Sequence, residues 1–404
     1  MGLKFQINIF STLRALSAAS ELTDLKIFNH SERVTYITMK IAEELELSQS
    51  TKHTLMKASL LHDVGVASSY EKLLVVDLSS EPSQVAPHCR SGAKLLEETK
   101  MFANLNEVVL RHHDPWNGPS LVDEQDKPDF LSQIICIADR IDSLIDTSVY
   151  ILWQKSNILD YLKQHSGTTF NPELVEIMLK IGGKDSFWLD LQTGFFQHYL
   201  EEIYPTGMQK LNLNQLEDIA QLFSKIIDRK SSFTANHSQG VANYAVQIGK
   251  EVGVNEIDLQ QLKIAGLLHD LGKLALPDQL LDYPGTYSEN QRLLMKQHTY
   301  QTYHLINFMG PGLNKIRDWA AYHHERLDGQ GYPFGLDASQ LDLGSRIIAV
   351  ADITQALTEN RPYRGSLPPD KVRGILRQLV AENALDPQVV EVAIPLIATS
   401  TYVS

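Results

Sequence analysis

A set of histidines and aspartates occurs twice in this chain of 404 residues, about half a chain apart. Ten of the 14 histidines belong to the two sets. The first set is His30, His62, Asp63, His88, His112, His113 and Asp139, and the second is His237, His269, Asp270, His298, His323, His324 and Asp352. The register drifts only slightly, from 30 against 237 to 139 against 352, as expected where loops lengthen. Because imidazoles and carboxylates converge most readily on metal ions, the repeat predicts two similar metal-binding domains.

The repeat extends beyond these residues and predicts an all-α fold in each half. Apolar residues at helical spacing follow the first histidine of each set, and a second helix leads to each His-Asp pair. An Asn or Asp cap followed by proline opens a last helix at 171–172 and again at 386–387. We find no alternating pattern that requires a sheet. We therefore expect two helical domains, 1–185 and 211–404, joined by a linker helix over 186–210, with an amphipathic opening helix packed on the first domain.

Composition narrows the classes of partner. The formal charge of −13 offers no basic face for duplex nucleic acid or an anionic membrane surface. We find no apolar run near the ~18–20 residues of a membrane span and no signal peptide. Cys89 and Cys136 fit a reducing cytoplasm, and we interpret both as small buried residues rather than metal ligands. The negative net charge does not exclude a small anionic ligand, because bound metal ions would make the charge positive locally.

The longest motif is His323-His324-Glu325-Arg326-Leu327-Asp328-Gly329-Gln330-Gly331-Tyr332-Pro333. Together with His269-Asp270-Leu271-Gly272-Lys273, it resembles the HD-GYP family of cyclic dinucleotide phosphodiesterases, over roughly residues 226–397. The first half resembles the broader HD phosphohydrolase superfamily. The resemblance implies two tandem HD-type domains, with the cyclic dinucleotide activity in the second.

For the second domain the resemblance implies a binuclear metal centre. Asp270 would bridge the two ions, His237, His269 and Asp352 would hold one, and His298, His323 and His324 would hold the other. Two such ions lower the pKa of a bound water and draw charge from phosphoryl oxygens. The resemblance makes iron or manganese the first expectation, with nickel or cobalt also compatible with this ligand set.

The resemblance also implies a substrate-binding set. Lys273 resembles the family lysine that contacts the scissile phosphate, and Arg361 and Arg364 resemble the family's substrate-binding basic pair, suited to phosphates and guanine edges. Tyr332 either shapes the pocket wall or locks the loop. Two positions depart from the family pattern. Phe233 replaces a glutamate linked to a third metal, and Gln355 replaces an acid three residues after the last ligand.

The first domain keeps every ligand type and loses the substrate residues. In the first domain Val66 occupies the position that Lys273 has in the second, and no arginine pair follows Asp139. The first domain does keep an acid, Asp142, at the position where the second domain has Gln355. Three interpretations fit: a metal-binding duplicate that stabilises or regulates its neighbour, a second hydrolase for a smaller phosphate ester such as the 5′-phosphate of the linear product, or a ligand sensor. Burying seven such polar side chains without metal is costly, so we expect metal in this domain as well.

The sequence therefore predicts a cytoplasmic enzyme of bacterial second-messenger signalling. It would open cyclic di-GMP or 3′3′-cyclic GMP-AMP to a linear 5′-phosphorylated dinucleotide. The alternatives are a non-catalytic cyclic dinucleotide receptor and a general HD-family nucleotidase. Protein partners and oligomeric state stay open.

Overall fold

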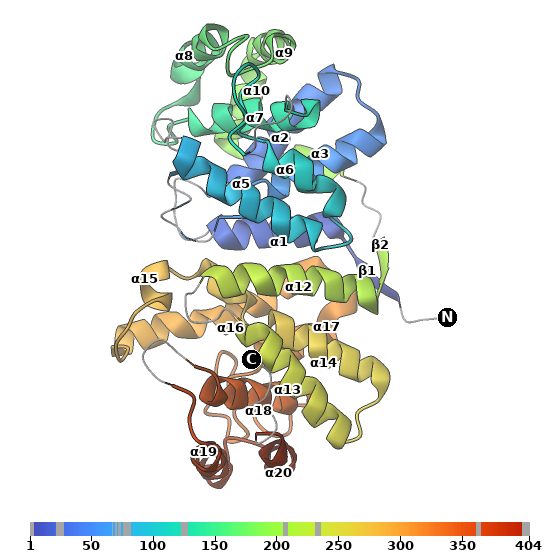
Figure 1. Ribbon diagram of the computed structural model, residues 1–404, viewed down its shortest axis with the longest axis vertical. Coiled ribbons are helices and arrows are strands. Elements are labelled where there is room, and N and C mark those ends of the chain that lie inside the picture. Colours follow the sequence, from blue (N-terminus) through green and yellow to red (C-terminus); the bar gives the residue numbers. More distant parts are fainter. Residues whose placement is uncertain are drawn as a thin grey trace. The chain divides into compact units, whose positions relative to one another are not determined.

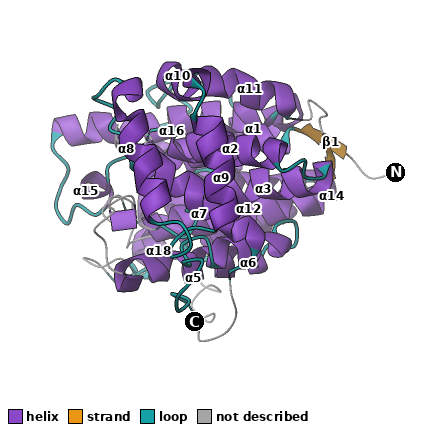
Figure 2. Ribbon diagram, turned by 90° about the horizontal axis from the view of Figure 1, so that it is seen from above, coloured by secondary structure: helices purple, strands orange, loops and turns teal. Residues whose placement is uncertain are grey.

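The computed structural model describes residues 4–21, 28–66, 68, 71, 74–75, 82–122, 128–204, 209–230, 236–360 and 365–397. The described residues are mostly helical (Figures 1 and 2), which confirms the predicted all-α class. Contacts between Cα atoms divide the chain into an N-terminal unit, Leu16–Gly207, and a C-terminal unit formed by Met1–Ala15 and Met208–Ser404. The division falls within helix α1 (Ile9–Glu21). The predicted limits 1–185 and 211–404 stay predictions.

The described helices of the N-terminal unit follow the end of α1. They are α2 (His30–Glu44), α3 (Gln49–Leu61), α5 (Pro82–Glu97), the 3-10 helix η1 (Ala103–Leu105), α6 (Asn106–Leu110), α7 (Phe130–Ser143), α8 (Ile151–Gln164), α9 (Pro172–Gly182), α10 (Asp185–Thr193) and α11 (Phe195–Ile203). Within it α2 packs against α3, α7, α9 and α11, so α2 is the central helix of the unit.

The C-terminal unit repeats this order. After strands β1 (Lys4–Ile7) and β2 (Gln209–Asn212) come α12 (Leu213–Lys230), α13 (His237–Glu251), α14 (Glu256–Leu268), η2 (Leu271–Ala275), α15 (Asp278–Leu281), α16 (Glu289–Met309), η3 (Pro311–Leu313), α17 (Asn314–Ala321), α18 (Leu343–Thr358), α19 (Pro369–Ala381) and α20 (Pro387–Leu396). Here α13 lies against α14, α18 and α20, so it takes the place that α2 has in the other unit.

Corresponding ligands occupy corresponding places on these helices. The first histidine begins α2 and α13, and the His-Asp pair directly follows α3 and α14. The third histidine lies within α5 or α16, the His-His pair follows α6 or α17, and the last aspartate lies within α7 or α18. The duplication seen in the sequence is therefore a duplication of helix order.

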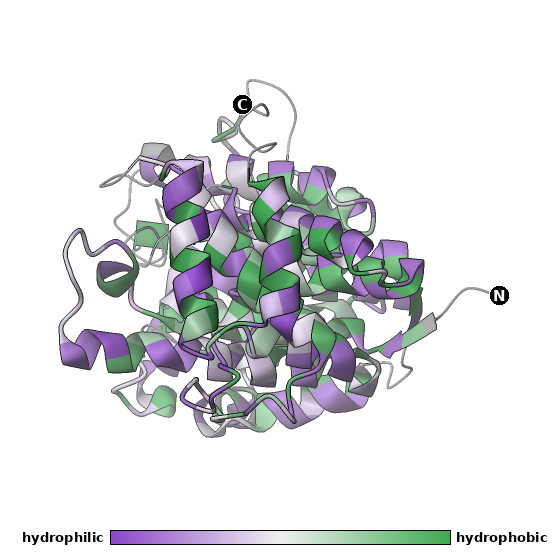
Figure 3. Cartoon of the chain, turned by 90° about the horizontal axis from the view of Figure 1, so that it is seen from below, coloured by the Kyte–Doolittle hydropathy of each residue, from purple (hydrophilic) through white to green (hydrophobic). Residues whose placement is uncertain are grey.

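The last helix of the repeat begins as predicted in both units. The Asn171 side chain accepts a hydrogen bond from the backbone of Glu173 at 2.9 Å, and the Asp386 side chain accepts one from Gln388 at 2.9 Å. Pro172 then opens α9, while a proline also opens α20. Capped ends satisfy backbone N–H groups that a helix leaves unpaired. Figure 3 shows hydrophobic and hydrophilic residues interleaved along the helices, the pattern of helices with one buried face.

The N-terminal segment departs from the prediction. Lys4–Ile7 forms strand β1, which pairs antiparallel with β2, so that Phe5 lies opposite Leu211. Asn8 N also donates to Met309 O at 3.1 Å. The expected opening helix thus begins only at Ile9, and the segment before it packs on the C-terminal unit rather than on the first domain. Strands of four residues are too short for an alternating pattern to stand out in a sequence.

The segment expected to form a linker helix contains two helices instead. Gly194, at φ 81°, ends α10, and α11 begins at the next residue. Both helices pack on the N-terminal unit, where Trp188 Nε1 donates to Gly182 O at 2.7 Å. Within the described residues, no helix combines the length and apolarity that crossing a membrane requires.

Candidate metal centres

The second set of histidines and aspartates converges in the C-terminal unit. Six of its members are buried, with exposed fractions of 8% or less, and His324 is partly exposed. The buried members are His237, His269, Asp270, His298, His323 and Asp352. Polar side chains buried together at this density need partners that offset the loss of hydration.

Backbone carbonyls orient three of these rings in the same way. In each case Nδ1 lies within hydrogen-bonding distance of the carbonyl three residues earlier. The pairs are His269 with Gly266 at 2.8 Å, His298 with Met295 at 2.7 Å and His323 with Ala320 at 2.7 Å. A carbonyl only accepts, so the proton belongs on Nδ1 and the lone pair of each neutral ring lies on Nε2.

Two of these lone pairs face each other. His298 Nε2 and His323 Nε2 are 3.2 Å apart. Burial lowers the pKa of His298 to about 3 and that of His323 well below its usual range, so both rings are neutral at neutral pH. Two acceptors cannot form a hydrogen bond with each other. The pair is therefore arranged for a cation that accepts both lone pairs, which is how histidine binds a metal.

Candidate ligand atoms lie within 4.8 Å of one another in three overlapping groups. The groups are His237, His269 and Asp352; His298, His323 and His324; and His269, Asp270 and His323. Asp270 contacts both sides, since Oδ2 is 3.2 Å from His269 Nε2 and Oδ1 is 3.5 Å from His298 Nε2. His269 Nε2 is buried and, within the described part of the chain, makes no hydrogen bond despite that contact. The donor set fits bound divalent metal ions.

Lys273 lies next to the shared carboxylate. Its Nζ is 2.5 Å from Asp270 Oδ2, and its side chain is 21% exposed. Burial alone would raise the pKa of Asp270, but His269 and Lys273 lower it well below the usual range, so the carboxylate is ionised. Lys273 therefore places one positive charge at the edge of the cluster.

Glu359, which the sequence analysis did not single out, orients the first histidine. Its Oε2 accepts from His237 Nδ1 at 3.0 Å and from Gln355 Nε2 at 3.1 Å. Burial alone would lower the pKa of His237, but hydrogen bonds to Asp352 and Glu359 raise it to about 10. A carboxylate thus supports this ring although Gln355 replaces the expected acid.

The Gly-Tyr-Pro loop is held by a buried acid. Glu325, 3% exposed, accepts from the backbone N–H groups of Phe334 at 2.7 Å and Leu336 at 2.9 Å. The ring of Tyr332 packs against His324, with centroids 4.9 Å apart, and Lys296 Nζ lies 5.0 Å from the Tyr332 centroid. The loop therefore presents an aromatic ring beside the cluster, next to Lys296 of α16.

The first set forms a second cluster in the N-terminal unit. His30 Nε2 and His62 Nε2 are 3.3 Å apart, and His88 Nε2 and His112 Nε2 are also 3.3 Å apart. Carbonyls again orient two rings, His62 through Ser59 at 2.7 Å and His112 through Val109 at 2.6 Å. Four buried atoms of this cluster lack a hydrogen-bond partner among the described residues: Asp63 Oδ1, His88 Nδ1, His113 Nε2 and Asp139 Oδ1. Such orphaned atoms are costly, so this donor set also fits bound metal.

The first histidine of this cluster has its own support. His30 Nδ1 contacts Asp142 Oδ2 at 2.7 Å, and Arg33 donates to the same carboxylate from Nε at 2.6 Å and Nη2 at 2.9 Å. In the C-terminal unit, Gly240 stands at the place of Arg33. A Cβ at Gly240 would lie 2.2 Å from the side chain of Gln355. The Arg–Asp pair of one unit is thus replaced by a Gly–Gln pair in the other.

Comparisons with known proteins agree with this geometry. Residues 27–144 and 221–389 each match the HD domain family. The 3′3′-cGAMP-specific phosphodiesterase 1 of Vibrio cholerae is 31% identical over 408 residues, which are 98% of this chain and 93% of the relative. The chain belongs to the HD-domain family of cyclic dinucleotide phosphodiesterases. The resemblance noted in the sequence is thereby confirmed.

Two further relatives of this phosphodiesterase are informative. The crystal structure of a cyclic GMP-AMP specific phosphodiesterase of V. cholerae matches with a TM-score of 0.64 at 25% identity, covering 99% of each chain. A cyclic di-GMP phosphodiesterase of Thermotoga maritima is 30% identical over 182 residues, 45% of this chain and 49% of the relative. Of these relatives, the two cyclic GMP-AMP phosphodiesterases are similar over both HD domains, and the cyclic di-GMP phosphodiesterase is similar over 45% of the chain.

Two expected features of this phosphodiesterase lie outside the described residues. They are the arginine pair, Arg361 and Arg364, and the position of the replaced glutamate, Phe233.

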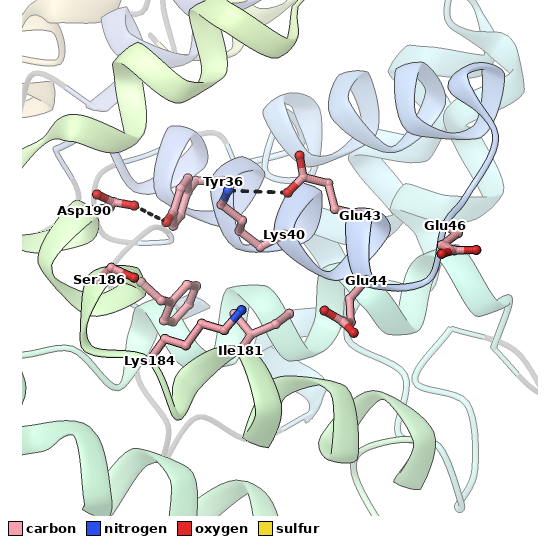
Figure 4. A pocket seen from close by; sticks show the side chains of 10 residues that line it. Tyr36, Lys40, Glu43, Glu44, Glu46, Ile181, Lys184, Ser186 and Asp190 are labelled. Carbon is pink, nitrogen blue, oxygen red and sulfur yellow. Dashed lines mark hydrogen bonds and ion pairs between the residues drawn. The ribbon is translucent and has the colours of Figure 1, made fainter.

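A polar cavity of about 380 Å³ lies at the far end of α2 from His30 (Figure 4). Several of its polar side chains already pair within the protein. Tyr36 donates to Asp190 at 2.7 Å, Lys40 contacts Glu43 at 3.4 Å, and Lys180, close by, contacts Glu44. A ligand there would have to displace these contacts, so this cavity is a weaker candidate site than the histidine clusters.

Proposed function

We propose that the C-terminal unit hydrolyses one 3′–5′ phosphodiester of 3′3′-cyclic GMP-AMP, giving a linear 5′-phosphorylated dinucleotide. The observation that carries this proposal is the double cluster around Asp270 with Lys273 at its edge. The choice of ring is supported by a relative named for this substrate, which aligns over 98% of the chain. Cyclic di-GMP is the competing substrate, since the relative with that name aligns over 45%.

Each residue has a proposed role. His237, His269 and Asp352 would hold one ion, His298, His323 and His324 the other, and Asp270 both. When bound, divalent iron or manganese would activate water and offset phosphoryl charge. Lys273 would leave Asp270 for the scissile phosphate, Tyr332 would line the pocket, and Arg361 with Arg364 would bind the outer phosphate or a base. In the balanced reaction, water supplies oxygen to phosphorus, the bond to the 3′ oxygen breaks, and that oxygen takes a proton.

For the N-terminal unit we propose a second hydrolytic site that removes the terminal 5′-phosphate of the linear product. Its support is the complete ligand set with four orphaned buried atoms. A cavity of about 370 Å³ is lined by Asn29 and by Arg33, whose guanidinium contacts Asp142 beside His30. A space of that size suits a phosphate ester smaller than a cyclic dinucleotide. A purely regulatory metal-binding domain is the alternative.

The test uses the full chain, purified without oxygen and loaded with iron or manganese. Cyclic GMP-AMP and cyclic di-GMP are supplied separately and the products are resolved by chromatography. We expect His269→Ala/Asp270→Ala to abolish ring opening, and His62→Ala/Asp63→Ala to leave ring opening but abolish loss of the terminal phosphate. Lys273→Ala should lower kcat by about 10²-fold or more with metal content unchanged.

Other outcomes identify the alternatives. Tight dinucleotide binding by metal-loaded protein without turnover would make the chain a receptor. Faster turnover of mononucleotides than of either ring would make it a general nucleotidase. Retained phosphate release in His62→Ala/Asp63→Ala would leave the N-terminal unit with a regulatory role.

A further inference from the structure

The N-terminal cluster contains a thiol that the C-terminal cluster lacks. Cys89 follows His88 on α5, is 1% exposed, and places Sγ 3.6 Å from His88 Nε2. At the equivalent place after His298, the C-terminal unit has Thr299, whose hydroxyl donates to Lys296 O at 3.0 Å. Cys89 Sγ also lies 3.8 Å from Val85 O, so both side chains contact a carbonyl of their own helix, and the two clusters differ in one donor atom, sulfur against oxygen.

Cys89 belongs to a compact group of four donors. One ligand atom each from His88, Cys89, His112 and His113 lies within 4.8 Å of the others. His112 has Nδ1 bound to Val109 O, which leaves Nε2 for the group. His88 Nδ1 and His113 Nε2 are buried and have no hydrogen-bond partner among the described residues. The C-terminal equivalent of His88, by contrast, has its Nδ1 held by a carbonyl.

We propose that Cys89 is a metal ligand, and that His88, His112, His113 and Cys89 form a three-nitrogen, one-sulfur site for a thiophilic divalent ion, with zinc preferred. Such ligand sets and four-coordinate geometry are typical of zinc. The C-terminal cluster, with nitrogen and carboxylate donors alone, suits iron or manganese better. The protein would thus hold chemically different metals in its two units. The inference rests on the proposed metal occupancy of the N-terminal unit and specifies it.

The site has a consequence for the proposed phosphatase activity. Four protein ligands leave this ion without an open position, which is the mark of a structural zinc site. The ion would hold α5 to the segment after α6. Water activation in this unit would then fall to the other group, His30, His62 and Asp63.

Cys136 provides a matched control. It lies on α7 of the same unit, is 5% exposed, and belongs to none of the donor groups found among the described residues. If Cys89 served only as a small buried side chain, alanine at either position would have the same effect on metal binding. A ligand role makes Cys89 alone matter.

The test is cobalt spectroscopy on the full chain carrying His269→Ala/Asp270→Ala, which removes the C-terminal site. We expect cobalt(II) to give visible d–d absorption and a near-ultraviolet sulfur-to-cobalt charge-transfer band. Adding Cys89→Ala should abolish that band and weaken cobalt binding by about tenfold or more, because even loss of a group behind the ligands costs 10–100-fold. Cys136→Ala should change neither. The charge-transfer band of the protein with Cys89 intact already tests whether sulfur binds cobalt, so the test still works if Cys89→Ala fails to fold.

Two results would overturn the inference, and they differ. Bound cobalt that depends on His112 but shows no charge-transfer band would exclude Cys89 as a ligand while leaving the N-terminal metal site in place. If His112→Ala changed no cobalt signal, the group of His88, Cys89, His112 and His113 would hold no cobalt and the inference would fail, whereas the absence of any bound cobalt in the parent would also remove the proposed metal occupancy of the N-terminal unit. Ring opening by the wild type is measured separately and depends on neither result.

Discussion

The acid that supports the first histidine lies at different positions in the two units. Asp142 serves His30, whereas Glu359 serves His237 and Gln355 occupies the place of the aspartate. Glu359 follows Gln355 by four residues, and residues four apart lie on one face of a helix. A longer acid one turn further along therefore still faces the ring. Carboxylates behind a metal-binding histidine fix the ring and raise its basicity.

Replacing that acid should weaken metal binding. We expect Glu359→Gln to lower metal affinity of the C-terminal site by about 10–100-fold, because the neutral amide holds the His237 ring less firmly. The measurement is a chelator competition on the full chain carrying His62→Ala/Asp63→Ala, so that only this site reports. Glu391→Gln is the control, since that side chain is 64% exposed on α20. Equal affinity in both variants would show that Glu359 has no part in the site.

At the scale of helices, the segment after each His-Asp pair crosses the helix that carries the third histidine, and the two backbones are in contact there. A Cβ at Gly272 would lie 1.9 Å from His298 O, and one at Gly65 would lie 2.0 Å from His88 O. Thr302 reinforces the crossing by donating to His269 O at 3.0 Å and accepting from Gly272 N at 2.9 Å. The glycine two residues after each His-Asp aspartate is therefore required for close approach, which positions the third histidine.

A side chain at this crossing should displace α16. We expect Gly272→Ala to lower the free energy of unfolding by about 1–3 kcal/mol, because overpacking forces the backbone to shift. It should also reduce bound metal, since His298 moves with the helix. Gly374→Ala is the control: on α19 a Cβ there meets nothing within 4 Å, and alanine should stabilise the helix by ~0.5–1 kcal/mol. Urea denaturation compares them, and a Gly272→Ala protein as stable as wild type would contradict this account of the crossing.

For the whole molecule, the two clusters make stability depend on metal. Each unit brings seven candidate ligands together from several helices, with unpartnered atoms among them. A ligand that binds only the folded state stabilises it by mass action, by about 2.7 kcal/mol at a hundredfold excess over Kd. Metal is thus expected to contribute to folding as well as to catalysis.

Metal removal should therefore lower the melting temperature. We expect a strong chelator to destabilise the wild type, and to have a smaller effect on either double variant, His269→Ala/Asp270→Ala or His62→Ala/Asp63→Ala. Differential scanning calorimetry before and after chelation measures this, with metal content determined in parallel. An unchanged melting temperature after complete metal loss would show that the clusters fold without ions.

The sequence by itself determined the parts that are local in the chain. The His-Asp and His-His pairs are adjacent residues, each next to a helix whose apolar spacing is readable, and the Asn-Pro and Asp-Pro caps lie within two residues. Their repetition was enough for the all-α class, the duplication and the family. Local spacing can do this because a helix converts it directly into one face.

Only the tertiary structure decided the contacts between distant residues. His237 and Glu359 are 122 residues apart, and the missing acid at Gln355 gave no sign that a later glutamate replaces it. The sequence indicated only a small buried residue at Cys89. In the folded unit its sulfur, on α5, lies close to His112 and His113, which follow α6. The β1–β2 pair likewise joins residues about 200 positions apart. Such contacts depend on how helices pack and rotate against each other, and that information is not contained in local spacing.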